Sequence, residues 1–194
     1  MSRMETIADL SAATVGRRLL AGAIDPVTVL ESCLERIARD PHGPVFLELT
    51  GERARREAEA AARRYREGRP LGPLDGVPVA WKDLFDLAGS RTTAASAIYR
   101  DAPPKTRDAP VVANLAAAGM VSLGKVNLSE FAYSGLGLNP HFGTPRNPHG
   151  GSEPRAPGGS SSGSGVAVAA GLAPCSIGTD TGGSVRIPAA FNGI

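Results

Sequence analysis

Two turns rich in glycine and serine are the densest source of chemistry in the sequence. The first reads GGSSSG over residues 158–163 and the second reads TDTGGS over residues 179–184, with an apolar stretch between them. Glycines let a backbone approach a ligand closely, and serine hydroxyls become nucleophiles once a base removes their proton. Because apolar segments separate the two turns, we interpret them as loops fixed to a core rather than as a linker.

The composition limits which side chain could act as a base on such serines. Of the 21 Lys and Arg residues only Lys82, Lys105 and Lys125 are lysines. Arginine stays protonated in proteins and cannot accept a proton. Lysine can do so only when neutral, which requires its reference pKa of about 10.4 to fall by roughly three units, worth on the order of 4 kcal/mol. Burial supplies shifts of this kind because desolvation disfavours the ammonium.

Helices and strands alternate around these turns, which favours an α/β layered fold. Asp25-Pro26 is typical of a helix start, with Asp as N-cap and Pro at the first helical position. Lys82 stands at the end of a strand whose residues Val77, Val79 and Trp81 alternate. The spacing predicts further helices over 27–37, 52–66, 108–118 and 166–170, the first with Leu30 and Cys33 on its apolar stripe. It also predicts a strand over 120–126, a short buried strand over 175–178, a loop-rich stretch over 135–159, and a short helix that begins at Asn127 with Glu130 as its capping-box partner.

Three ordered motifs resemble the amidase signature family. They are GPLDGVPVAWKD over residues 72–83, GKVNLSEFAYSG over 124–135, and GGSSSGSGVAVAAGLAPCSIGTDTGGSVRIPA over 158–189. The resemblance implies an α/β amidase signature fold with a mixed central sheet flanked by helices. Members are typically more than twice this long, so we expect 1–194 to be a single, incomplete, N-terminal part of that domain. Within it we expect N-terminal helices over about 5–67, the lysine-motif strand over about 73–87 and the signature segment over about 157–194.

The resemblance also implies a Ser-Ser-Lys triad. Ser184 would be the nucleophile, Ser160 the middle serine after a cis peptide bond, and Lys82 the base. The oxyanion hole would be formed by the backbone N–H groups of Thr181, Gly182, Gly183 and Ser184. Supporting roles would fall to Gly159, Ser161, Thr179, Asp180 and Arg186, the last two as a buried ion pair that shapes the turn. Taken singly, Ser184 is equally well explained as a helix cap, and Lys82 as an exposed charge at a strand end.

Three functions stay open at this point. The resemblance implies an amidase that hydrolyses the C–N bond of a small-molecule carboxamide through an acyl-enzyme on Ser184. It is also compatible with the ammonia-releasing A subunit of a glutamyl-tRNA amidotransferase, which would have partner subunits. A third possibility is a truncated remnant without activity. A homodimer is a further possible assembly.

Charge and composition argue against other classes of protein. The net charge of +2, with scattered arginines and few aromatics, leaves no nucleic-acid footprint. Cys33, Cys175 and three scattered histidines give no metal-ligand spacing, and we expect no metal and no cofactor. No signal peptide or membrane span is predicted, so the cytoplasm is the expected compartment.

Two further motifs lack their required context. GSSSG at 159–163 fits a G-x-S-x-G nucleophile elbow, but proline-rich sequence precedes it and no histidine follows it. Residues 119–125 fit a phosphate loop, but Val126 stands where Ser or Thr should reach magnesium.

Overall fold

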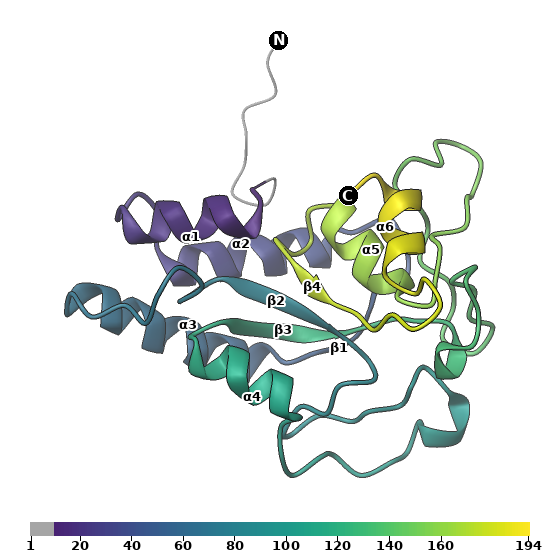
Figure 1. Cartoon of the computed structure of the whole chain (residues 1–194), viewed down its shortest axis with the longest axis horizontal. Helices are drawn as coiled ribbons and strands as arrows, with labels where there is room; N and C mark the ends of the chain where they lie inside the picture. The colour runs from purple at the N-terminus through teal and green to yellow at the C-terminus, as the bar shows by residue number, and fades with distance from the viewer. Residues whose placement is uncertain (1–9) are drawn as a thin grey trace.

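The computed structural model describes residues 10–194, and its centre is a four-stranded sheet with the order β1–β3–β2–β4 (Figure 1). β1 (Phe46–Leu49) pairs antiparallel with β3 (Val121–Val126). β2 (Pro78–Lys82) runs parallel to β3 and to β4 (Ser176–Ile177). The sheet is therefore mixed and flanked by helices, as expected. Because β2 and β4 are parallel neighbours, the loops that follow them both leave from the carboxyl ends of the strands, on the same side of the sheet.

Six α-helices and two 3-10 turns surround the sheet among residues 10–194. Their bounds are α1 (Ala12–Leu20), α2 (Pro26–Ala38), α3 (Gly51–Arg66), α4 (Pro110–Ala117), α5 (Ser162–Ala169), α6 (Arg186–Asn192), η2 (Ala97–Tyr99) and η3 (Glu130–Ala132). α2 begins as predicted, because the Asp25 carboxylate accepts the N–H of Val27 at 2.8 Å and Pro26 occupies the first turn. None of the helices among these residues is long and apolar enough to cross a bilayer.

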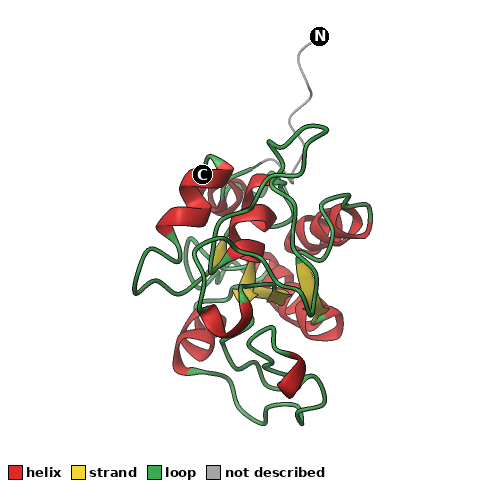
Figure 2. Ribbon diagram, turned by 90° about the vertical axis from the view of Figure 1, so that its right-hand side faces the viewer, coloured by secondary structure: helices red, strands yellow, loops and turns green. Residues whose placement is uncertain are grey.

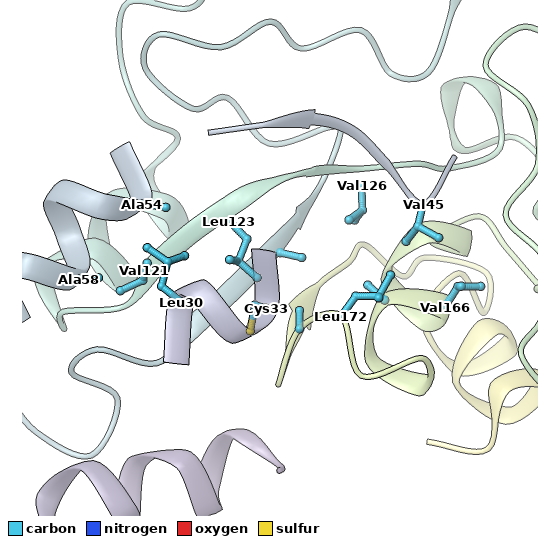
Figure 3. Packing of buried hydrophobic residues seen from close by; sticks show 13 residues of the cluster. Leu30, Cys33, Val45, Ala54, Ala58, Val121, Leu123, Val126, Val166 and Leu172 are labelled. Carbon is cyan, nitrogen blue, oxygen red and sulfur yellow. The ribbon is translucent and has the colours of Figure 1, made fainter. Parts of the chain in front are cut away.

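Two apolar clusters hold the helices against the sheet. In the first, Leu30 and Cys33 of α2 pack with Val121 and Leu123 of β3, together with buried residues of α3 and α5 (Figure 3). The second gathers apolar residues of α1, β2 and α4, Trp81 among them. The expected helical stripe of α2 is confirmed, with Leu30 and Cys33 fully buried. Strand alternation explains why successive residues of β2 contribute to different clusters.

Two local predictions were wrong, and one alternative interpretation is excluded. Asn127 caps no helix, because its amide donates to the carbonyls of Pro44 and Gly143 and its side-chain oxygen accepts the N–H of Leu128. The short turn η3 is preceded by Ser129 instead. Residues 175–178 are half-buried rather than buried, since β4 forms the edge of the sheet. Nor does Ser184 cap α6, whose N-cap is Val185 without a side-chain hydrogen bond.

Loops build the end of the molecule where β2, β3 and β4 lead out. Figure 2 shows this end covered largely by irregular chain rather than by helices. It includes most of 83–109 and 127–161, the second of which was predicted to be loop-rich from Gly135 onward. Residues 5–9 of the expected N-terminal helical region lie outside the described residues.

Close packing of α5 against the sheet requires glycine at position 163. A Cβ there would lie 2.4 Å from the N atom of Asn127 and 2.9 Å from the carbonyl oxygen of Val45. Both are backbone atoms, so we expect Gly163→Ala to destabilise the fold by about 1–3 kcal/mol, seen as a melting temperature lower by roughly 3–10 °C. The matched control is Gly51→Ala at the start of α3, where the nearest atom is the flexible end of Arg55 at 3.5 Å. Equal melting temperatures for the two variants would contradict this account.

Candidate active site

The amine of Lys82 lies at the carboxyl end of β2 and is surrounded by hydroxyl groups. Its Nζ donates to Ser160 Oγ at 2.7 Å and to Thr179 Oγ1 at 2.7 Å. Lys82 is the last residue of β2, and Thr179 lies two residues beyond the neighbouring parallel strand β4, so the sheet itself brings them together. Lys82 and Ser160 have no exposed surface. The alternative interpretation of Lys82 as an exposed charge at a strand end is therefore wrong.

Ser160 is held by backbone contacts on both sides just before α5. Its carbonyl accepts the N–H of Ser129 at 3.0 Å, and the N–H of Gly159 donates to the carbonyl of Gly135 at 2.8 Å. A Cβ on Gly159 would lie 2.5 Å from the N atom of Gly137, so only glycine fits there. The peptide bond between Gly159 and Ser160 is cis, as the resemblance implies.

Burial suits Lys82 to accept a proton near neutral pH. Desolvation lowers the pKa of its ammonium from 10.5 to about 8, and the negative charge of Asp180 opposes the shift only in part. The shift has the direction that the chemistry of a lysine base requires. A neutral Nζ can accept a proton from the Ser160 hydroxyl across the 2.7 Å contact.

The same shift predicts how Lys82 affects stability. The folded-state pKa of about 8 lies below the unfolded value, so the unfolded chain binds more protons between pH 8 and 10.5 and stability rises with pH across that window. Lys82→Met removes this dependence. We expect the stability of Lys82→Met relative to the wild-type chain to fall by about 3 kcal/mol between pH 7 and 10.5, since each unit of pKa shift is worth about 1.4 kcal/mol. Urea unfolding of both proteins at the two pH values measures the difference. A constant difference would mean that the pKa of Lys82 is not lowered.

The turn that carries Ser184 lies beside the buried serines. The N–H of Ser161 donates to the Ser184 carbonyl at 3.1 Å, and the Ser161 hydroxyl contacts the Thr179 carbonyl at 3.4 Å. Among residues 10–194 the Ser184 hydroxyl makes no hydrogen bond, with Ser160 or otherwise. Ser184 is half-buried, whereas Thr181 and Gly182 are exposed. The turn that carries Ser184 thus packs against Ser161 and is partly exposed to solvent.

Asp180 organises the turn that carries Ser184. Its ion pair with Arg186 was expected to be buried, but the Arg186 side of the pair is exposed. The guanidinium donates to both carboxylate oxygens, at 3.0 and 3.1 Å, while 77% of the Arg186 side chain is exposed. Arg186 is the first cause of the strongly lowered pKa of the Asp180 carboxyl, and the N–H groups of Val185, Arg186 and Gly183 lower it further. Arg186 is the first residue of α6, and the described residues leave its side chain at the surface. The pair still fixes the course of the backbone from 180 to 186.

The predicted oxyanion donors differ in their hydrogen bonding. The N–H of Gly183 donates to Asp180 Oδ1 at 2.7 Å, so in this structure it is not available to bind an oxyanion. Within residues 10–194 the N–H groups of Thr181, Gly182 and Ser184 donate to no acceptor. Gly183 has a φ of 109°, which side-chain-bearing residues rarely adopt, and this accounts for glycine at that position.

Sequence analysis missed several residues that hold the site together. Ser129 binds the Ser160 carbonyl, and the buried amide of Asn139 donates to the carbonyls of Ala95 and Leu128. Lys125 and Asp83 form a buried ion pair. The Lys125–Asp83 pair could have been predicted from the sequence, because Lys125 lies inside a segment predicted to be a strand and Asp83 directly follows Lys82. A lysine in the middle of a buried strand needs an acidic partner.

This fold is that of the amidases. The chain belongs to that family, whose model, described as Amidase, matches residues 28–194. Among solved structures, the peptide amidase of Stenotrophomonas maltophilia is similar with a TM-score of 0.83 and 41% identity, over 94% of this chain and 38% of that one. A structure described as a vestigial protein complex that reveals the evolutionary origins of an s-triazine catabolic enzyme has a TM-score of 0.86 and 43% identity, over 93% and 39%. The expected amidase signature fold is confirmed.

Two relatives represent different activities. The chain is 46% identical over 187 residues to the A component of the glutamyl-tRNA(Gln) amidotransferase of Symbiobacterium thermophilum, covering 95% of this chain and 38% of that protein. It is 50% identical over 177 residues to AtzE, a component of the 1-carboxybiuret hydrolase of Pseudomonas sp. (strain ADP), covering 91% and 38%. The chain therefore spans about two fifths of the length of these relatives.

Proposed function

We propose that the protein hydrolyses the C–N bond of a small carboxamide through an acyl-enzyme on Ser184. The observation that carries this proposal is the buried Lys82 amine, 2.7 Å from Ser160 Oγ and with its pKa lowered to about 8. A serine hydrolase needs a base matched to neutral pH, and this arrangement supplies one without histidine. Membership in the amidase family supports amide bonds as the target.

In the proposed reaction, neutral Lys82 accepts the Ser160 proton while Ser160 accepts the proton of Ser184. Ser184 Oγ then attacks the amide carbon, and the oxyanion is held by the free N–H groups of Thr181, Gly182 and Ser184. The proton taken up by Lys82 returns through Ser160 to the amide nitrogen, the C–N bond breaks and the amine leaves. Water then hydrolyses the ester at Ser184 by the same relay. One well-placed oxyanion donor is worth on the order of 3 kcal/mol in the transition state.

Ammonia and acyl transfer together test this function. The chain is incubated with a panel of primary carboxamides, with and without hydroxylamine. The proposal predicts ammonia release, and hydroxamate formation in proportion to the hydroxylamine added, because hydroxylamine intercepts an acyl-enzyme. A folded chain that releases no ammonia from any amide would favour the inactive remnant.

A second function is favoured by the 46% identity to the A component of a glutamyl-tRNA(Gln) amidotransferase. Here the amide would be glutamine, and the ammonia would pass to partner subunits. Glutamine-dependent ammonia release that increases when such partners are added would support this candidate. Hydrolysis of simple carboxamides that is unaffected by added partners would support the stand-alone amidase.

A further inference from the structure

A second buried lysine lies behind the proposed base. Lys125 Nζ is 2.6 Å from Asp83 Oδ1, and the two side chains are 0% and 1% exposed. Asp83 directly follows Lys82, and Lys125 faces Trp81 in the register of β2 and β3. Since strand side chains alternate, this pair and Lys82 lie on opposite sides of the sheet. Lys125 takes no part in the proposed proton relay.

Both members of the ion pair hold the loop 91–95. Lys125 Nζ donates to the Arg91 carbonyl and to Thr92 Oγ1, each at 3.1 Å. Asp83 Oδ2 accepts the N–H of Thr93 at 3.0 Å and its hydroxyl at 2.5 Å. The backbone of Asp83 adds a further bond, from the N–H of Ala94 to its carbonyl at 3.0 Å. The loop is thereby fixed at every residue from 91 to 94.

The loop in turn holds the segment that binds Ser160. The Ala94 carbonyl accepts the N–H of Phe131 at 3.0 Å, and the N–H of Ser129 donates to the Ser160 carbonyl at 3.0 Å. Ala94 and Phe131 have φ angles of 52° and 51°. Such angles are uncommon for residues with a side chain and persist only where surrounding contacts fix them. The ion pair fixes the neighbouring residues 91–93, and the backbone carbonyl of Asp83 binds Ala94 itself.

Stability alone does not account for this ion pair. Two charges removed from water carry a desolvation cost that their attraction often fails to exceed, and apolar residues of similar volume commonly stabilise a fold as well or better. What the pair offers beyond an apolar contact is directional hydrogen bonding to a loop.

We propose that Lys125 and Asp83 are positioning residues that hold Ser160 in place through loop 91–95 and residues 129–131. The inference rests on the proposed function for its kinetic effect, but its structural effect is independent of that function. Loosening the pair displaces Ser160 relative to Lys82 and slows proton transfer. A misplacement of about 1 Å costs on the order of a hundredfold in rate.

The test compares the double variant Asp83→Asn/Lys125→Met, which leaves no unpaired charge, with the wild-type chain. Saturation labelling by a fluorophosphonate gives the maximal rate constant, the half-saturating concentration and the fraction labelled. We expect the maximal rate constant to fall about a hundredfold. The half-saturating concentration and the labelled fraction should stay within about threefold of the wild-type values. A variant that is only destabilised would instead lose labelled fraction. Lys105→Met is the matched control, because its pair with Asp86 is 3.4 Å long and 40% exposed on both sides.

Amide hydrogen exchange gives a readout independent of activity. We expect exchange of the Ser129 and Phe131 N–H groups to become at least about tenfold faster in the double variant. Should that variant not fold, Thr93→Val decides. It removes the hydrogen bond from the Thr93 hydroxyl to Asp83 and the one that this hydroxyl accepts from the N–H of Ala95, and it leaves the ion pair in place. It should accelerate exchange at Phe131 and slow labelling a few-fold. A folded variant with wild-type exchange and labelling would overturn the inference. A wild-type chain that is not labelled would overturn the proposed function, leaving exchange to decide the positioning role.

Discussion

Replacing Ser184 by alanine is expected to abolish covalent labelling of the chain by a fluorophosphonate and to remove amide hydrolysis. The probe reacts only with an activated serine hydroxyl, and no other serine of the proposed relay can replace this one, because Ser160 has no exposed surface. Loss of a serine nucleophile in comparable enzymes lowers kcat by about 10⁶. Mass spectrometry of the labelled wild-type chain should place the adduct on the peptide that contains Ser184.

Ser162→Ala is the matched control for this variant. Ser162 lies in the first of the two serine-rich turns, its hydroxyl is buried, and that hydroxyl makes no hydrogen bond among residues 10–194. Its removal should leave labelling unchanged. An adduct on Ser160, Ser161 or Ser162 in the wild-type chain would show that the nucleophile has been assigned to the wrong turn.

Replacing Lys82 by alanine is expected to slow labelling of Ser184 by roughly 10²–10⁴-fold, the usual contribution of a general base. Lys82→Arg should be about as slow, because a guanidinium keeps its proton and cannot act as a base. Rate constants measured under saturating probe separate this effect from weaker binding.

Lys105→Ala serves as the control for a lysine without a role in the site. Its side chain is 40% exposed and, among residues 10–194, is paired only with Asp86. It should label at the wild-type rate. A Lys82→Arg variant that keeps the full rate would show that position 82 requires a positive charge and not a base, which would contradict the proposed relay.

Much of the scaffold could be predicted because its signals are local. Asp25-Pro26 marks the start of α2, and alternation marks β2 with Lys82 at its end. The proximity of Lys82 and Ser160 could not be obtained in this way. They are 78 positions apart, and only the resemblance to the family indicated that they meet.

The errors and omissions involve tertiary contacts. Asn127 has the sequence spacing of a helix cap, but its amide finds two carbonyls from loops distant in sequence, and these compete successfully with local capping. Asp180 and Arg186 do pair, yet their exposure depends on what covers the turn. None of these outcomes is encoded in the spacing of the residues concerned.

The central claim is that an uncharged lysine at position 82 activates Ser184, and the pH dependence of labelling tests it most directly. The pKa of about 8 predicts a rate constant that rises tenfold per pH unit below pH 8 and levels off above it. In Lys82→Met the residual labelling should lose this step. A wild-type profile that is flat from pH 6 to 9, or a step that persists unchanged in Lys82→Met, would contradict the account.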